Sequence, residues 1–169
     1  MELKNKLEII NNFPKGGIKF FDITSLIQDG ELFNEVINKM EEKIDCSYDK
    51  VVALDARGFI LGSPISYNNK KGLVIVRKKG KLPPKVISTS YTLEYGEGIL
   101  EMKENAITKG EEVIIIDDLL ATGGTAKASI DLVEKLGGVV KKLIFLIEFN
   151  IIIIPINFVR MFLIYSRDF

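Results

Sequence analysis

The 169-residue chain contains no histidine, and this absence removes several kinds of chemistry at once. It excludes Ser-His-Asp and Cys-His nucleophilic machinery and every metal site built on imidazole. Acid–base catalysis would fall to carboxylates, lysines or tyrosines. A bound metal would be a hard cation with oxygen ligands, such as Mg²⁺.

Three further shortages narrow the class of protein. The one cysteine, Cys46, cannot form an intrachain disulfide, which fits a reducing cytosol. The 23 Lys and Arg residues equal the 23 Asp and Glu residues in number, and this zero formal charge gives no electrostatic footprint for nucleic acid. The first ten residues, MELKNKLEII, lack the apolar stretch of a signal peptide. We therefore expect a cytoplasmic protein with no nucleic-acid partner.

Strand and helix patterns alternate along the chain and predict one α/β domain over residues 1–169, with a mostly parallel sheet between helices. The expected strands are 50–54, 73–76, 112–116 and 139–147, and the expected helices are 1–12, 31–44, 58–67 and 125–136. Residues 13–22 are expected to form a loop. Residues 78–103 form a long connection that we expect to contain a β-hairpin pairing 86–95 with 99–103, and such long connections are usually functional.

The segment 113–125, VIIIDDLLATGGT, is the most informative part of the chain. A β-branched strand runs into the acid pair Asp117 and Asp118, and a helix pattern follows a small loop of Ala121, Thr122, Gly123, Gly124 and Thr125. Backbone N–H groups and a helix N-terminus suit a phosphate, and the carboxylates suit sugar hydroxyls. Neither a Walker A loop nor GxGxxG is present. The alternative is an ordinary strand–loop–helix without a ligand, and paired acids also occur in metal sites and phospho-acceptor domains.

Two more polar segments follow predicted strands and are expected at the same edge of the sheet. Asp55-Ala56-Arg57-Gly58 follows one strand, where Arg57 offers a planar fork for a phosphate. The alternative there is a helix cap by Asp55 with a solvated Arg57. Residues 77–81, RKKGK, follow another strand, and these four cations suit an anionic substrate unless they form a solvated turn.

The segment 113–125 resembles the phosphoribosyl pyrophosphate (PRPP) signature of the type I phosphoribosyltransferases. Four further segments resemble the adenine branch of that family: FPKGGIKFFDIT (13–24), LDARGFILG (54–62), RKKGKLP (77–83) and SYTLEYG (90–96). The resemblance covers about residues 1–149. It implies the type I phosphoribosyltransferase fold, with an N-terminal hood over residues 1–30 and a flexible β-hairpin arm over residues 78–103. It also implies a homodimer that transfers the phosphoribosyl group of PRPP to adenine, giving AMP and pyrophosphate.

The resemblance further implies a role for individual residues. Glu94 would be the catalytic group, acting at N7 of adenine. Pyrophosphate, with Mg²⁺ bound through PRPP and not by the protein directly, would be held by Arg57, Arg77, Lys78 and Lys81. Asp117 and Asp118 would bind the ribose hydroxyls, and residues 121–125 the 5′-phosphate. The remaining substrate contacts would come from Asp55 and Ala56, joined by a non-prolyl cis peptide bond, from Tyr95, and from the adenine pocket of Lys19, Phe20 and Phe21.

The last twenty residues depart from the family, in which a polar turn and a final strand are usual. They read NIIIIPINFVRMFLIYSRDF, and polar residues interrupt the apolar run too often for a membrane span. This tail over 150–169 is an extra strand, a dimer-contact segment or the out-of-frame end of a damaged gene. Three alternatives to the adenine enzyme remain: a phosphoribosyltransferase for another purine, a non-catalytic PRPP-binding regulator, and an inactive gene product.

Overall fold

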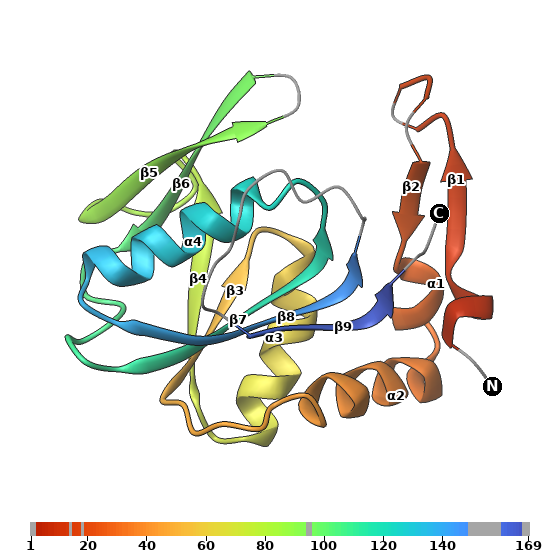
Figure 1. The fold of residues 1–169 in the computed structure, drawn as a ribbon, viewed down its shortest axis with the longest axis horizontal. Helices are drawn as coiled ribbons and strands as arrows, with labels where there is room; N and C mark the ends of the chain where they lie inside the picture. The colour runs from red at the N-terminus through yellow and green to blue at the C-terminus, as the bar shows by residue number, and fades with distance from the viewer. Residues whose placement is uncertain (1–2, 14, 18, 94–95, 149–159, 167–169) are drawn as a thin grey trace.

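A seven-stranded sheet forms the centre of the protein (Figure 1). The structure is a computed structural model that describes residues 3–13, 15–17, 19–93, 96–148 and 160–166. The strands lie in the order β5 (Val86–Leu93), β6 (Gly96–Lys103), β4 (Gly72–Lys78), β3 (Lys50–Leu54), β7 (Glu112–Leu120), β8 (Val139–Glu148) and β9 (Arg160–Ser166). The helices are α1 (Thr24–Ile27), α2 (Gly30–Glu41), α3 (Arg57–Asn68) and α4 (Gly124–Lys135). The predicted α/β class is confirmed.

The strand order reverses between β3 and β7. From β3 the chain crosses through α3 to β4, and after the β5–β6 hairpin it returns to the other side of β3 as β7. Both neighbours of β3 are parallel to it. Ligands of open α/β sheets bind outside the carboxyl ends of the strands at such a reversal.

The carboxyl end of β7 projects past β3. The pairing of β3 with β7 ends at Ala53 and Ile116, whereas β7 stays paired with β8 as far as Leu120. The strand is therefore longer than the predicted 112–116 and contains the acid pair. One side of its last four residues faces the loop that follows β3, and side chains from two loops meet there.

The sheet is buried on both faces, which explains why its central strands are apolar throughout. Ile114 and Ile116 of β7 pack with α2 and α3, while Val113 and Ile115 pack with α4 and β6 on the other face. All four are completely buried. Each such side chain contributes about 1.5–3 kcal/mol, and together they fix the register of β7.

The N-terminal prediction is wrong in its type of structure. Residues 3–6 form one 3₁₀ turn, but β1 (Glu8–Asn11) pairs antiparallel with β2 (Lys19–Asp22), so neither a helix over 1–12 nor a loop over the whole of 13–22 is present. The apolar spacing in residues 1–12 fits a helix. The β-branched pair Ile9 and Ile10, however, lies opposite Phe20 and Phe21. Antiparallel pairing with β2 overrides the local pattern.

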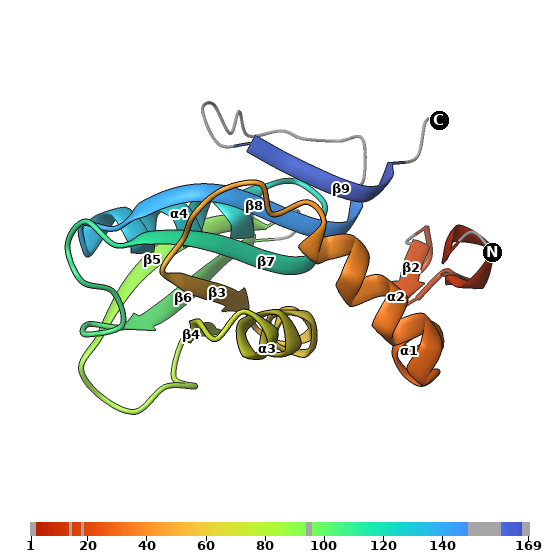
Figure 2. The same ribbon diagram turned by 90° about the horizontal axis from the view of Figure 1, so that it is seen from below.

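Part of the C-terminal tail forms a strand. Figure 2 shows β9 alongside β8, at the opposite edge of the sheet from the β5–β6 hairpin. The two strands are parallel. The extra-strand interpretation is therefore confirmed for residues 160–166, and the other tail residues lie outside the described part of the chain. Among the helices that the structure describes, none is long and apolar enough to cross a bilayer.

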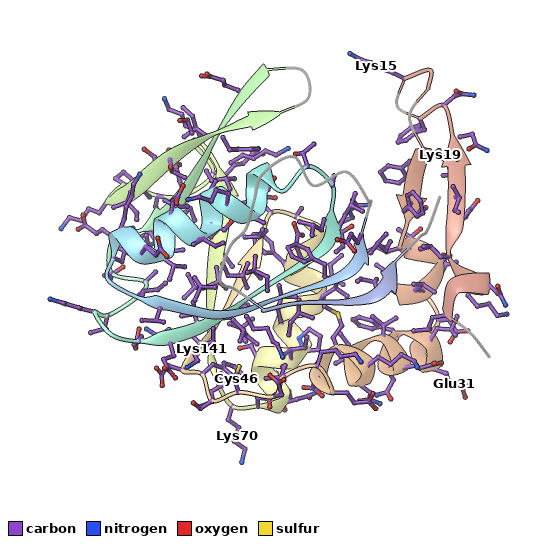
Figure 3. All side chains as sticks on the ribbon, viewed as in Figure 1. Lys15, Lys19, Glu31, Cys46, Lys70 and Lys141 are labelled. Atoms are coloured by element: carbon purple, nitrogen blue, oxygen red, sulfur yellow. The ribbon has the colours of Figure 1, made fainter. Side chains whose placement is uncertain are left out.

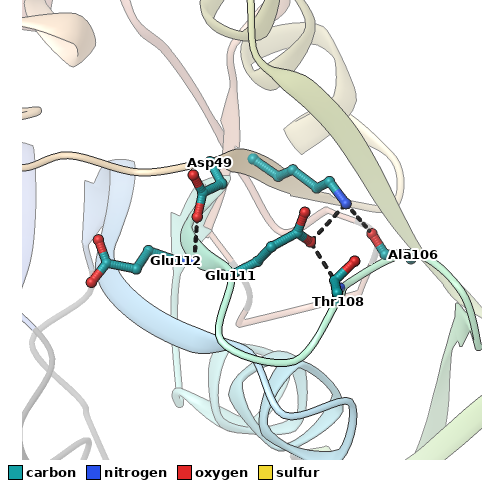
Figure 4. A network of polar contacts seen from close by, with 6 residues as sticks. Asp49, Ala106, Thr108, Glu111 and Glu112 are labelled. Atoms are coloured by element: carbon teal, nitrogen blue, oxygen red, sulfur yellow. Dashed lines mark hydrogen bonds and ion pairs between the residues drawn. The ribbon is translucent and has the colours of Figure 1, made fainter.

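Ion pairs and hydrogen bonds tie the strands together at the edge where β3, β7 and β8 begin (Figure 4). Lys50 of β3 lies 2.7 Å from Glu111 Oε2, which also accepts the backbone N–H of Thr108. Glu112 receives Lys141 of β8, one of the residues labelled in Figure 3, at 2.9 Å. The hydrogen bond from Lys50 is the main reason that the pKa of Glu111 is lowered. These contacts lie at the opposite ends of the strands from the acid pair.

Lys142 of β8 is the one lysine of the described residues with an almost fully buried side chain, which is 1% exposed. Its Nζ donates to the carbonyl of Lys43, just after α2, and pairs with Asp45. A buried ammonium requires such partners. Lys142 therefore fastens the chain after α2 to the centre of the sheet.

We expect Lys142→Ala to lower the free energy of unfolding by about 2–3 kcal/mol, because it leaves a cavity and removes the partners' donor. Lys142→Met fills the volume and should cost about 1 kcal/mol. Urea denaturation measures both. Lys141→Ala, at the neighbouring half-buried lysine that pairs with Glu112, is the matched control and should cost less than about 1 kcal/mol. Equal effects of the two alanine variants would contradict the anchoring role.

Candidate functional site

A pocket of about 350 Å³ lies at the carboxyl ends of β3, β4 and β7, next to the N-terminus of α4. Polar residues from three loops and apolar residues from the sheet surround it. Its lining consists of Asp55, Ala56, Arg57, Lys78, Tyr91, Leu100, Asp117, Asp118, Leu119, Leu120, Ala121, Thr122, Gly123, Gly124, Thr125, Ala126 and Phe145. The position is the reversal point of the strand order, where a ligand is expected.

The acid pair forms the floor of this pocket and depends on a missing side chain. Asp117 Oδ1 accepts the backbone N–H of Asp118 at 2.9 Å. Gly58, in the first turn of α3, lies so close that an added Cβ would come within 2.9 Å of both Asp117 Oδ1 and the carbonyl of Ile116. Any larger residue at position 58 would displace the acid or the strand. Sequence reasoning assigned no contact to Gly58.

Burial changes the ionisation of both acids. It raises the pKa of Asp117 well above the ordinary aspartate value, and the neighbouring charge of Asp118 raises it further. Asp117 is partly open to the pocket, but protein atoms surround it on its other sides. This burial is why the pKa of Asp117 is raised. Burial also raises the pKa of Asp118, while the Arg57 guanidinium opposes this effect. Two adjacent acids in such a site cannot both ionise without cost.

Arg57 connects the acid pair to β2. Its Nη2 lies 2.8 Å from Asp118 Oδ2, and its Nη1 donates to the carbonyl of Phe21 at 3.2 Å. Its guanidinium lies over the ring of Phe20, 5.1 Å from the centroid, where a cation–π attraction is favourable. The alternative of a solvated Arg57 beside a helix cap by Asp55 is wrong, because α3 has no side-chain cap and Arg57 is held on three sides.

The buried oxygen Asp118 Oδ2 has a cation nearby but lacks a hydrogen-bond donor. The Arg57 contact satisfies the distance for an ion pair, yet its N–H is not aimed at the oxygen, and no other described residue donates to it. The oxygen can accept a donor from a ligand once Arg57 turns toward another anion, and a sugar hydroxyl is such a donor.

The loop after β4 holds the cations in a defined turn. Arg77 Nε lies 3.1 Å from Asp55 Oδ2, and Arg77 Nη1 donates to the carbonyl of Lys81 at 3.1 Å. The carboxylate of Asp55 follows β3, so this ion pair joins the two loops. Lys78 lines the pocket, while the side chain of Lys81 is exposed and does not.

The loop over residues 121–125 leads into α4 with its first N–H groups toward the pocket. Gly123 is the N-cap and has a left-handed backbone with φ 84°, and no side chain caps the helix. The first N–H groups of a helix lack partners within the helix, and its dipole favours an anion. The predicted phosphate loop therefore has the local geometry of an anion site.

The structure places most of the predicted substrate residues in one region. Asp55, Ala56, Arg57, Lys78, the acid pair and residues 121–125 line the pocket, and the Asp55–Ala56 peptide bond is cis, as predicted. Arg77 contacts this set through Asp55, and Phe20 and Phe21 contact it through Arg57. Lys19 lies farther along β2, and the pocket does not include its side chain. Glu94 and Tyr95 lie outside the described residues.

The apolar lining was not predicted. Tyr91, Leu100 and Phe145 come from different strands, and of these only Tyr91 belongs to a motif, SYTLEYG. Only Tyr91 had a signal, because its spacing of four from Tyr95 places both on the same face of a strand. Among the described residues, no group of three His, Cys, Asp or Glu side chains is arranged to hold a metal ion.

Comparison with protein families identifies residues 24–154 as matching the phosphoribosyl transferase domain. The adenine phosphoribosyltransferase of Acetivibrio thermocellus is 51% identical over 150 residues, covering 88% of each chain. The adenine phosphoribosyltransferase of Caldicellulosiruptor saccharolyticus is 52% identical over 149 residues, covering 88% of this chain and 85% of the relative.

Solved structures resemble the chain over a larger share of its length. The adenine phosphoribosyltransferase of Thermoanaerobacter pseudethanolicus superimposes with a TM-score of 0.92 at 41% identity, covering 96% of each chain. The Saccharomyces cerevisiae enzyme, solved with adenine and an imino-altritol bisphosphate, gives a TM-score of 0.88 at 34% identity and 97% coverage of each. Structural similarity thus extends beyond the part that is similar in sequence.

We expect Asp117→Asn to raise the free energy of unfolding of the empty protein by about 1–2 kcal/mol at pH 7. A carboxyl whose pKa is raised by folding binds protons more strongly in the folded state, so its contribution to stability falls as pH rises above 3.8. The variant should remove that part of the pH dependence. Thermal unfolding from pH 4 to pH 8 tests this, with Asp131→Asn on α4 as the control. A less stable Asp117→Asn at neutral pH would contradict the electrostatic argument.

Proposed function

Because this chain belongs to the phosphoribosyl transferase family, we propose that it transfers the 5-phosphoribosyl group of PRPP to adenine, giving AMP and pyrophosphate in purine salvage. One observation carries the proposal: the acid pair, the loop over residues 121–125 and the Asp55–Arg57 segment surround a single pocket. The pocket offers acceptors for hydroxyls beside donors for phosphate, and PRPP needs both.

The phosphoribosyl part is bound between β7 and α4. Asp117 and Asp118 accept hydrogen bonds from the ribose hydroxyls, which provide the donor that Asp118 Oδ2 lacks. The backbone N–H groups of residues 121–125 bind the 5′-phosphate at the start of α4. This grip fixes the position of the ribose C1, so positioning supplies much of the rate enhancement.

The cations bind the pyrophosphate and stabilise it as it leaves. Arg57, Arg77, Lys78 and Lys81 supply this charge from the loops after β3 and β4. In the structure Arg57 and Arg77 are paired with Asp118 and Asp55. The incoming diphosphate exchanges these carboxylates for its own oxygens, which frees Asp118 for the ribose. Negative charge that develops on the leaving group then meets cations already in place.

The base lies beside β2, opposite the phosphates. Lys19 and Phe21 offer backbone groups to the edge of adenine, and Phe20 offers an apolar ring. Phe20 is held edge-on against Phe13, with centroids 5.2 Å apart, and carries Arg57 on its ring. Glu94 acts at N7 of adenine as general acid or hydrogen-bond partner. Tyr95 follows it on the arm, which closes over the site and excludes water.

Mg²⁺ is proposed to arrive with PRPP, bound by oxygens of the diphosphate. The carboxylates and phosphates of such a site are the hard donors that Mg²⁺ prefers. When bound, the ion neutralises charge on the leaving pyrophosphate. The part of the protein is to orient the diphosphate through Arg57, Arg77 and Lys78.

We also propose that the protein is a cytoplasmic homodimer. The large apolar side chains Ile60 and Tyr67 lie seven residues apart on α3 and are 39% and 85% exposed. Leu73, at the start of β4, is 39% exposed as well. A second copy could cover such residues, whereas water alone covers them in the monomer.

The direct test mixes the purified protein with PRPP, Mg²⁺ and one purine base, and measures nucleotide and pyrophosphate. We expect AMP, with kcat/KM for adenine about 100-fold or more above that for hypoxanthine or guanine, because an edge-reading pocket leaves unpaired groups with the wrong base. Comparable use of hypoxanthine would indicate another purine as substrate. PRPP binding without turnover on any base would instead indicate a regulator or an inactive product.

We expect Glu94→Ala to lower kcat by about 10²–10⁴-fold, the usual contribution of a general acid. The dissociation constant of PRPP should change by less than about twofold, because Glu94 acts on the base. Rapid-quench kinetics and calorimetry measure the two quantities. Glu97→Ala, which removes an exposed carboxylate from the same hairpin, is the control and should leave both unchanged. Unaltered turnover in Glu94→Ala would remove this residue from the mechanism.

A further inference from the structure

Glu101 of β6 is a buried carboxylate outside the pocket lining. Glu101 is 7% exposed, and its Oε2 accepts a hydrogen bond from the backbone N–H of Gly80 at 2.9 Å. Within the described residues, no lysine or arginine nitrogen lies within 4.0 Å of its carboxylate. Burying a charge beside a single backbone donor is costly, so the contact calls for a functional reason.

Gly80 is the turning point of the cation loop, the segment 77–81. Its φ of 80° lies in the left-handed region that favours glycine. The turn on either side is closed by backbone contacts: Lys79 N donates to the carbonyl of Ile99, and Lys81 N to that of Lys78. Glu101 adds the one side-chain bond to the peptide at the tip, opposite Arg77 in the strand register. The cation loop is thereby held on one side by β6 and on the other by Arg77, the first residue of the loop.

We infer that Glu101 is a positioning residue, which holds the cation loop in the shape that receives the pyrophosphate of PRPP. This inference rests on the proposed function of the same loop. The hydrogen bond from Gly80 to a carboxylate is charge-assisted and stronger than a neutral one. The negative charge also offsets the mutual repulsion of Lys78, Lys79 and Lys81, which share one short turn. The cations are thus organised before the substrate arrives.

The same contact joins the cation loop to the arm. Strand β6 begins at Gly96, directly after the segment that carries Glu94, and reaches Glu101 five residues later. Its pairing with β5 is continuous from Gly96 to Lys103. The hairpin and the cation loop therefore form one hydrogen-bonded unit, and the group that acts on the base is linked to the groups that bind pyrophosphate.

Hydrogen exchange tests the contact itself, without substrate. In Glu101→Ala the Gly80 amide should exchange about tenfold faster, because its acceptor is gone. Glu101→Gln keeps an acceptor oxygen and should restore most of the protection. Glu104→Ala removes an exposed carboxylate just after β6 and serves as the matched control for charge. Equal Gly80 exchange in the original protein and Glu101→Ala would overturn the contact.

Calorimetry with PRPP and Mg²⁺ tests the positioning role. We expect Glu101→Ala to bind PRPP about tenfold more weakly, with the KM for adenine unchanged and with affinity recovered in Glu101→Gln. A folded Glu101→Ala with unaltered PRPP affinity would overturn this inference alone, as would a Gln variant as weak as the Ala variant. Failure of the original protein to bind PRPP would overturn the proposed function and this inference with it.

Discussion

Two adjacent carboxylates held in a largely buried place, Asp117 and Asp118, are the constraint around which the site is built. Burial raises the pKa of both, and the charge of Asp118 raises that of Asp117 further, so holding the two acids ionised lowers the stability of the fold. Gly58 makes room for the first acid, and Arg57 supplies the charge that the second requires. A ligand with hydroxyl donors relieves this cost. Part of the folding stability that is lost at β7 would therefore contribute to the affinity for such a ligand.

The charged side chains around the pocket are close to balanced, and this balance governs how an anion would bind there. Arg57 and Arg77 each face an aspartate from a neighbouring loop. In the proposed reaction, the diphosphate of PRPP carries more charge than either carboxylate and can accept bidentate hydrogen bonds from both guanidiniums, so it would displace the internal partners. The carboxylate of Asp118 would then become available for a sugar hydroxyl. Arg57 also donates a hydrogen bond to the Phe21 carbonyl of β2, so a movement of Arg57 toward the phosphates would also affect β2. The base side and the phosphate side of the site thus share one side chain.

The sequence predicted the parts of the fold that depend on local chemistry. The strand over 50–54 and the phosphate loop over 121–125 carry strong local patterns, and both occupy the places expected. The pairing of β1 with β2 was missed because pairing between residues that are 8 to 14 positions apart leaves no periodic pattern in the sequence. Glu101 was missed for a different reason: in the sequence it is one polar residue of an alternating strand, and only the packing shows that it is buried. Residue type reveals chemistry, whereas burial is a property of the whole fold.

The C-terminal strand shows that an edge strand places few requirements on the residues that form it. Seven successive residues of strand β8 are buried, from Lys142 to Glu148. The side of β8 that faces away from β7 therefore needs a neighbouring strand. Strand β9 provides one with RMFLIYS, a run rich in residues that favour strands. Parallel pairing forms between backbone groups, so it depends on the length and apolar character of the strand and not on the identity of each side chain. For this reason the superposition on relatives covers 96% of the chain although the sequence match covers 88%. The tail can depart from the family in sequence while the sheet that supports the acid pair stays complete.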